Sequence, residues 1–212
     1  MKGNGNEDGE NHILLRQEVG RFLVNPRLRA PPSLGILEIT NLAVLRASTG
    51  DSLSSSTALD GHTKWYWLTG STVTRLHLGR YRNTDDSWRL PSQIRYMTGL
   101  KRLALWNCSF IPTEIAKLSN LKRLDLNYCD ERLNLPRVEM QRLKILVIGG
   151  GTSSWDERRI QLVLSWASIY APKLTQFAFY NHSTETAKLF IKSLLTCEFS
   201  IRRTLANLEI IN

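Results

Sequence analysis

The chain repeats one pattern of apolar and polar positions through its middle part. The segment Leu100-Lys-Arg-Leu-Ala-Leu recurs 21 residues later as Leu121-Lys-Arg-Leu-Asp-Leu, and 22 residues after that as Leu143-Lys-Ile-Leu-Val-Ile. The connecting segments are also similar, because an apolar residue is followed by proline at Leu90-Pro and at Ile111-Pro. A fixed period of this size is typical of a solenoid, whose successive turns stack on one another.

The same pattern, with apolar residues at positions 1, 4 and 6 of each copy, predicts six or seven strands, the copy at Leu34 being a divergent one. Besides the three central copies, it starts at Leu34, Val73, Leu174 and Leu205. Each copy is expected to contribute one strand to a parallel sheet, with neighbouring strands about 4.8 Å apart. The apolar positions are expected to face inward and to stack on their counterparts in adjacent turns. Positions 3, 5 and 7 are then expected on the opposite, exposed surface, because successive residues of a strand alternate between faces.

After the third central copy the spacing lengthens to 31 residues, which leaves room for two helices. The capping box Ser154-Trp-Asp-Glu157 predicts the start of the first helix, which ends before Pro172. The second is predicted from Thr184 to Thr196. The inner faces are expected to carry Ile160, Val163, Leu164 and Ala167 in the first helix, and Ala187, Phe190, Ile191 and Leu194 in the second.

The N-terminal part divides into a capping segment and the start of the repeats. Residues 11–24 are predicted to form a helix, with Leu15, Val19, Phe22 and Leu23 on one face. We expect residues 1–33 to be a segment whose helix caps the first repeat, although a docking helix for another protein would have the same pattern. The repeat domain then covers residues 34–212. Within it, residues 46–61 are rich in Ser, Thr, Gly and Asp and are expected to form a flexible excursion.

Residues 73–148 resemble leucine-rich repeat proteins in their L-x-x-L-x-L spacing. The stretch from Ile111 to Leu126 is similar to the repeats of plant immune receptors and Ras-group scaffolds, and the longer helical repeats of residues 149–212 to those of F-box adaptors. The resemblance implies an α/β leucine-rich repeat solenoid, with a curved parallel sheet on its concave side and helices and irregular turns on its convex side. It also implies a non-enzymatic scaffold that binds a protein through the concave face.

A row of arginines marks the candidate binding surface on this face. Arg75, Arg102 and Arg123 occupy position 3 of adjacent copies, and Trp106 is a large aromatic residue at an exposed position. Arginine and aromatic side chains dominate the energetics of protein interfaces. The alternative is that Lys-Arg within L-K-R-L only keeps such repeats soluble. The candidate partner-binding residues are Arg75, His77, Arg102, Trp106, Arg123, Asp125, Asn127, Tyr128 and Tyr180.

The distribution of charge would suit an acidic partner, and the alternative is that hydrated Lys and Arg side chains only keep the protein soluble. The net charge is +9, and residues 1–72 carry none of it, because their basic and acidic residues are equal in number. A basic surface attracts an acidic protein or a nucleic acid. The second candidate function is therefore that of a structural subunit of a ribonucleoprotein or another large assembly, whose basic face contacts RNA.

Composition indicates a folded, soluble protein in the cytoplasm or the nucleus. Hydrophobic residues make up 42% of the chain and charged residues 22%. No apolar run approaches the roughly 18 residues of a membrane span, so no contact with a membrane is expected. Residues 1–11 are polar and lack the apolar run of a secretory leader.

The sequence contains no recognisable catalytic or metal-binding motif, so no cofactor, metal or enzymatic activity is expected. Cys108 and Cys129 occupy the Asn/Cys position of the repeat, where a small side chain turns inward. No cysteine pair has the spacing of a zinc site, and the four histidines are scattered. The glycine run 149–151 precedes a predicted helix. It could cradle a phosphate, but a sharp turn is the simpler interpretation because no complete phosphate-binding motif is present.

Overall fold

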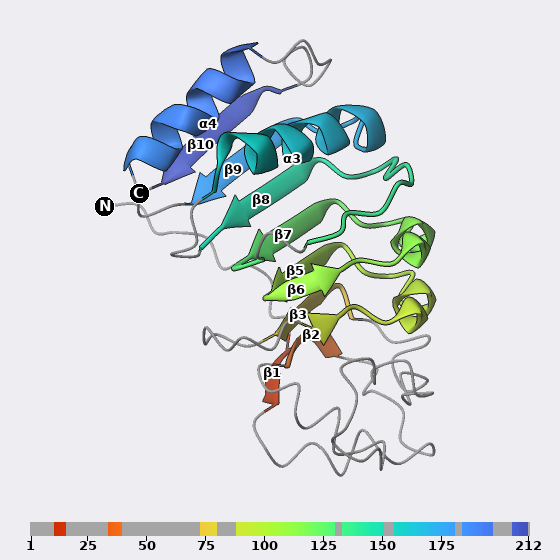
Figure 1. Ribbon diagram of the computed structural model, residues 1–212. Helices are drawn as coiled ribbons and strands as arrows, with labels where there is room; N and C mark the ends of the chain where they lie inside the picture. The colour runs from red at the N-terminus through yellow and green to blue at the C-terminus, as the bar shows by residue number, and fades with distance from the viewer. Residues whose placement is uncertain are drawn as a thin grey trace, which may run out of the picture.

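The computed structural model is a mixed α/β protein with a parallel sheet and two α-helices (Figure 1). The structure describes residues 11–15, 34–39, 73–79, 88–129, 133–150, 155–180, 184–196 and 205–211. Side chains are described throughout these ranges except in 11–15 and 34–39 and at residue 211, where only the backbone is described.

The main sheet has eight strands, and every neighbouring pair is parallel. The strands follow one another across the sheet in chain order, from one edge to the other. Every copy of the repeated pattern contributes one strand, the copy at Leu34 included, and β1 is an eighth. The strands are β1 (Asn11–Leu15), β2 (Leu34–Ile39), β3 (Arg75–Gly79), β5 (Arg102–Trp106), β7 (Arg123–Asn127), β8 (Ile145–Gly149), β9 (Gln176–Tyr180) and β10 (Asn207–Ile211).

The register of the sheet aligns equivalent positions of successive copies. Arg102 pairs with Arg75 on one side and with Arg123 on the other, and Leu103 is aligned with Leu124. A slip of one residue would turn each leucine toward the opposite face, so the buried leucines fix this register.

The apolar positions form the core between the sheet and the helices. In the three central copies every side chain at positions 1, 4 and 6 is 2% exposed or less. This confirms the inward direction predicted for them. The side chains are Leu100, Leu103, Leu105, Leu121, Leu124, Leu126, Leu143, Leu146 and Ile148.

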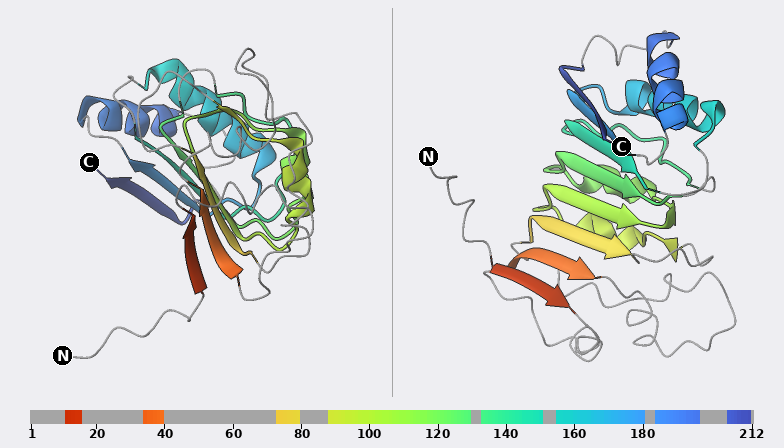
Figure 2. Two further views of the ribbon diagram at one scale, coloured as in Figure 1. Left: turned by 90° about the horizontal axis from the view of Figure 1, so that it is seen from below. Right: turned by 90° about the vertical axis from the view of Figure 1, so that its left-hand side faces the viewer.

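Helices cover one side of the sheet (Figures 1 and 2). The shorter turns contain the 3-10 helices η3 (Ser92–Tyr96) and η4 (Thr113–Lys117), which each start after a proline and bury one isoleucine. The longer turns contain α3 (Glu157–Tyr170) and α4 (Thr184–Thr196). Among the described residues, the α-helices therefore lie in the longer turns and the 3-10 helices in two of the shorter ones.

A second, two-stranded parallel sheet joins two of the shorter turns. Its strands are β4 (Trp88–Arg89) and β6 (Cys108–Phe110). A single bridge between Phe110 and Asn134 extends the same ladder to the next turn. Backbone hydrogen bonds thus join successive turns in the main sheet and also in the segments that follow its strands.

The helix predicted at the N-terminus is wrong over the residues that the structure describes. Asn11–Leu15 is strand β1, which extends the sheet beside β2. Hydrogen bonding to the open edge of a sheet outweighs the weak preference of a short apolar segment for the helical state. A strand therefore occupies the place predicted for the capping helix. Residues 16–33, and the excursion predicted for 46–61, lie outside the described residues.

Both predicted C-terminal helices are confirmed, but the start of α3 differs from the prediction. Its N-cap is Asp156, whose carboxylate accepts a hydrogen bond of 2.8 Å from the Arg159 N–H. The predicted capping residue, Ser154, lies outside the described residues. The predicted inner face of α3 is buried as expected.

The inner face of α4 differs from the prediction at one position. Ile191 is 42% exposed, whereas Ser193 is buried. The Phe190 ring stacks on Phe179 with a centroid distance of 4.6 Å and lies 5.2 Å from Phe177. This contact sets the rotation of the helix, so the residue three places after Phe190 faces inward.

The two described cysteines have the roles expected from their place in the repeat. Both are buried thiols without a disulfide. The Cys108 thiol donates to the carbonyl of Phe110 at 3.2 Å, and the Cys129 thiol to that of Asn127 at 3.5 Å. Each thiol thus pairs with a backbone carbonyl close to the end of its strand.

Leu124→Ala should lower the free energy of unfolding by about 2–5 kcal/mol, because Leu124 is fully buried in the centre of the stack. Leu195→Ala is the matched control, since Leu195 is 61% exposed on α4 and should cost less than about 0.5 kcal/mol. Urea unfolding followed by circular dichroism measures both values. Equal costs for the two variants would contradict the register.

Candidate functional site

The face of the sheet away from the helices, which we name the open face, carries positions 3, 5 and 7 of the copies (Figure 2). The register arranges these positions in three rows that cross the strands. All the predicted binding residues except Tyr128 lie in these rows, and Tyr128 directly follows β7. The first row holds Arg75, Arg102 and Arg123, the second His77 and Asp125, and the third Trp106, Asn127 and Tyr180.

Two of the arginines share one carboxylate. Arg102 donates from Nε and from a terminal amino group to Oδ2 of Asp125, at 2.9 Å and 2.6 Å. Arg123 donates from Nε to Oδ1 of the same residue at 2.7 Å. These three residues, which we name the arginine cluster, join neighbouring strands β5 and β7. Asp125 therefore compensates the repulsion between two like charges that the register places side by side.

Burial of Asp125 corrects the prediction that its row is exposed. Asp125 is 2% exposed, and its neighbours in the row on β5 and β8 are Ala104 and Val147, which are also buried. Arg102 and Arg123 of the first row contact the Asp125 carboxylate directly. A carboxylate among such neighbours needs paired cations, and the arginines supply them.

The arginine cluster retains donors for a ligand. A guanidinium has five N–H groups in one plane. Arg102 uses two of its own on Asp125, and Arg123 uses one. The two side chains are 33% and 31% exposed, so part of each remains accessible to a ligand. Because one carboxylate holds both side chains, they lose less conformational entropy when they bind an anion.

An aromatic pair lies beside the cluster in the adjacent strands. The rings of His77 and Trp106 are 5.6 Å apart and tilted by 58°. Trp106 is half-buried, and its carbonyl accepts a hydrogen bond of 2.7 Å from the Trp88 indole. Arg75 is exposed and next to Arg102 in the first row. The open face thus combines cations with an aromatic surface at β3, β5 and β7.

Tyr128 has a structural role at the end of β7, away from the first row. Its backbone is left-handed, with φ of 53°, as is that of the equivalent Asn107, with φ of 54°. The equivalent residue in the next copy of the repeat is Gly150, with φ of 72°. A Cβ at Gly150 would lie 2.6 Å from the Tyr128 ring. Glycine is therefore required where the Tyr128 ring packs, which supports the interpretation of the glycine run as a turn.

Tyr180 is in the third row, on β9, with one strand between it and β7. The residue on that strand is Gly149, where a Cβ would lie 2.6 Å from Cβ of Tyr180. The Tyr180 side chain thus lies beside Gly149, which has no side chain. Asn127 is half-buried in the same row.

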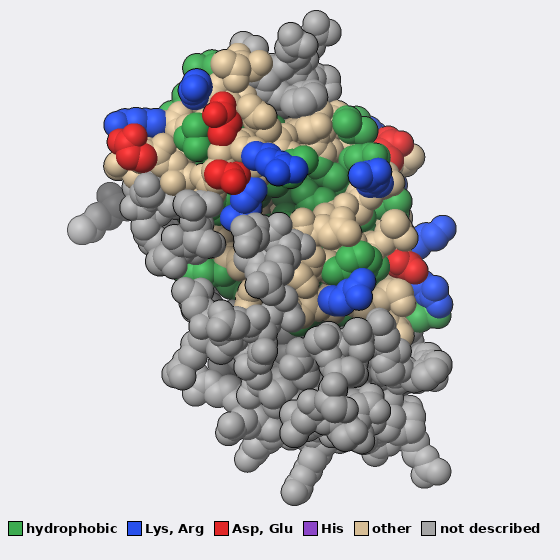
Figure 3. All heavy atoms as spheres, viewed as in Figure 1, with side chains coloured by type: hydrophobic (Ala, Val, Ile, Leu, Met, Phe, Trp, Pro, Cys, Tyr) green, Lys and Arg blue, Asp and Glu red, His purple; other side chains and the backbone are tan. Residues whose placement is uncertain are grey.

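Sequence reasoning missed an apolar groove on the opposite side of the molecule, between α3 and residues 133–137 (Figure 3). Leu162 and Ile169 line it from α3 and are 60% and 59% exposed. The available signal was their spacing of seven residues, which places two large apolar side chains on one helix face outside the predicted inner stripe.

Burial determines the chemistry of the Cys108 thiol. Its surroundings raise its pKa from the ordinary 9.0 to about 12, although hydrogen bonding to the backbone at Phe110 and Leu90 opposes the rise. The thiol therefore stays protonated at neutral pH, whereas a nucleophile must be a thiolate. Among the described residues, no group of His, Cys, Asp and Glu could hold a metal ion.

No family model matches the chain, and comparisons with curated proteins and with solved structures found no match. None of the helices that the structure describes has both the length and the apolar character needed to cross a membrane.

Alkaline pH should destabilise the fold through Cys108. Because the folded state holds the thiol proton more tightly than the unfolded state, stability is retained below pH 9 and falls as the pH rises from 9 toward 12. Urea unfolding across this range should show a smaller loss for Cys108→Ala than for the unchanged chain. The difference between the two losses of stability separates the effect of the Cys108 thiol from the effects of lysine and tyrosine side chains. Parallel pH profiles would contradict the effect of burial.

Proposed function

We propose that the chain is a leucine-rich repeat solenoid of the cytoplasm or nucleus that acts as a non-enzymatic scaffold and binds an acidic protein on its open face. The repeated L-x-x-L-x-L pattern, the parallel strands in chain order and the inward leucines support the repeat architecture. The open face is then the concave surface of the solenoid.

The arginine cluster is the observation on which the proposed binding function depends. Its two guanidinium groups are held in place by a buried carboxylate, yet each remains about one-third exposed. Such side chains can form paired hydrogen bonds to an aspartate or glutamate of a partner. The nearby Trp106 adds an aromatic surface of the kind found at the centres of interfaces.

The same geometry favours a protein over RNA as the partner. A phosphate backbone is bound by runs of cations along its length. In the first row, arginine gives way to Ile145 and then Gln176 on the strands that follow β7. Asp125 also cancels one of the positive charges at the cluster. The open face therefore offers a local cationic site beside aromatic side chains, which suits an acidic segment of a protein.

Affinity capture with the full chain, with and without nuclease, followed by mass spectrometry identifies the partner. A protein captured equally well after nuclease treatment supports the proposal. Binding that depends on RNA, and that weakens by a factor of about 1,000 or more between roughly 50 and 200 mM salt, would support the ribonucleoprotein alternative instead.

The variant Arg102→Met/Asp125→Val/Arg123→Met should lose binding to the captured partner by at least about 30-fold, because hot-spot residues contribute 2 kcal/mol or more. Removing the three charges together leaves no buried carboxylate without its cations, and replacement of such a set by apolar residues generally preserves stability. Calorimetric titration measures the dissociation constant, and circular dichroism checks that the variant is folded.

Lys101→Met/Lys122→Met is the matched control for this variant. Both lysines are exposed and adjacent to the arginines in sequence, at position 2 of their copies. The control removes two positive charges, whereas the cluster variant removes only one net charge. Binding lost in the control but kept in the cluster variant would mean that overall charge, and not the arginine cluster, attracts the partner.

A further inference from the structure

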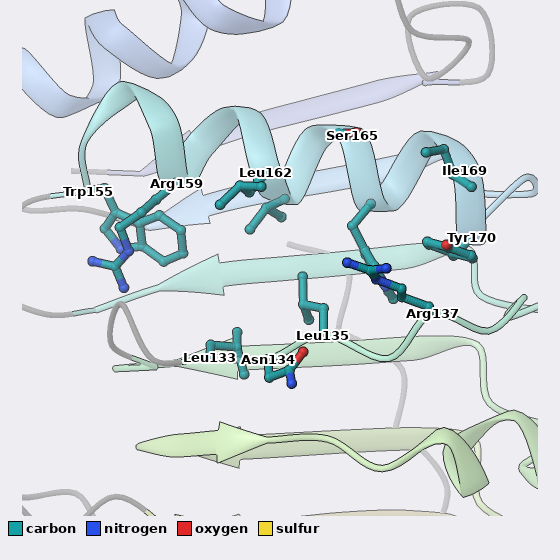
Figure 4. A pocket seen from close by; sticks show the side chains of 12 residues that line it. Leu133, Asn134, Leu135, Arg137, Trp155, Arg159, Leu162, Ser165, Ile169 and Tyr170 are labelled. Atoms are coloured by element: carbon teal, nitrogen blue, oxygen red, sulfur yellow. The ribbon is translucent and has the colours of Figure 1, made fainter.

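The groove on the helix side of the sheet has a volume of about 450 Å³ and is open to solvent. α3 forms one wall, and the extended residues 133–137 form the other (Figure 4). The floor is anchored to the core, because the Trp166 indole donates a hydrogen bond of 2.7 Å to the carbonyl of Pro136. The groove is therefore held between elements that are fixed to each other.

The groove exposes large apolar side chains that nothing in the described part of the chain covers. Leu162 and Ile169 are each about three-fifths exposed. They lie on the same face of α3, two turns of the helix apart. Leu133 and Leu135 of the facing wall are half-buried against the core. A contiguous apolar surface of this kind on a soluble protein usually marks an interaction site.

Arginine supplies the charge at the groove. Of the described residues that line it, two are charged, Arg137 and Arg159, and neither charge is negative. In Figure 4, Arg159 lies near the start of α3 and Arg137 near its end, with the leucines between them. The Arg159 guanidinium lies 4.8 Å from the centre of the Trp155 ring and donates a hydrogen bond of 3.4 Å to the carbonyl of Cys129. Asp156, close by in sequence, is engaged as the N-cap of α3.

We propose that this groove is a second docking site, and that its occupant is a short segment of another protein with apolar side chains between acidic ones. The apolar side chains would cover Leu162 and Ile169, and the carboxylates would pair with Arg137 and Arg159. Two guanidinium groups on either side of an apolar floor fit this alternation and reject a basic segment. The site lies on the side of the sheet opposite the arginine cluster, so one chain can hold two partners at once.

Selection of a display library of short random peptides against the full chain tests this site. A counter-selection against Leu162→Asp, which places a carboxylate in the groove, removes peptides that bind elsewhere. The peptides bound by the unchanged chain but not by the variant should be rich in Asp and Glu together with Leu, Ile, Phe or Trp. A recovered peptide should bind at least about tenfold more weakly to Arg137→Glu. The cluster variant Arg102→Met/Asp125→Val/Arg123→Met should bind it normally, which separates this site from the open face.

Leu195→Asp is the control, because Leu195 is 61% exposed on α4 and is not part of the groove. It should leave peptide binding unchanged. The proposal is overturned if no peptide is lost on Leu162→Asp, if the lost peptides are not acidic, or if Leu195→Asp weakens binding equally. It is also overturned if sedimentation shows a dimer that Leu162→Asp dissociates, because the groove would then be an interface between two copies of this chain.

Discussion

The stacking of equivalent positions in successive strands is the constraint on which the rest of the structure depends. No turn can bury its leucines alone, and each is covered by the turns before and after it. Backbone hydrogen bonds keep the same alignment. The carbonyl of Lys101 accepts from the N–H groups of Lys122 and Arg123, at 2.9 and 3.1 Å, and the carbonyl of Lys122 repeats the arrangement with residues 144 and 145. Once this register is set, the alternation of side chains along each strand decides which residues lie on each face of the sheet.

The register that buries the leucines also assembles the arginine cluster. Residues at position 3 meet across strands whether or not their charges are compatible, so Arg102 and Arg123 lie side by side. Asp125, two residues further along β7, turns this repulsion into a pair of ion pairs of 2.6 and 2.7 Å. The compensation leaves two oriented guanidinium groups at the surface. The copy at Leu121 differs here from the copy before it, because Asp125 is aligned with Ala104, and the proposed binding site depends on this carboxylate.

The sequence was sufficient to predict the features that follow from periodicity. The seven strands, the buried leucines of the central copies, the inward cysteines and the bounds of α4 all depend on local spacing. Features that depend on contacts between distant residues could not be predicted. Strand β1 forms because β2 offers it an edge, and the Asp125 carboxylate is paired because Arg102 on β5 and Arg123 on β7 both donate to it. The exposure of Ile191 follows from the stacking of Phe190 on Phe179, and the groove from the packing of Trp166 against Pro136.

In the proposed function Asp125 positions the two arginines for an acidic partner, and the affinity of Asp125→Ala for that partner tests this role most directly. If charge alone governs binding, removal of a negative residue from a basic surface should tighten binding to an acidic protein. If positioning governs it, binding should weaken by about tenfold despite the added net positive charge, because both guanidinium groups lose their anchor. Calorimetric titration of the folded variant distinguishes the two. A weaker complex is the predicted result, and an equal or tighter complex would contradict the account.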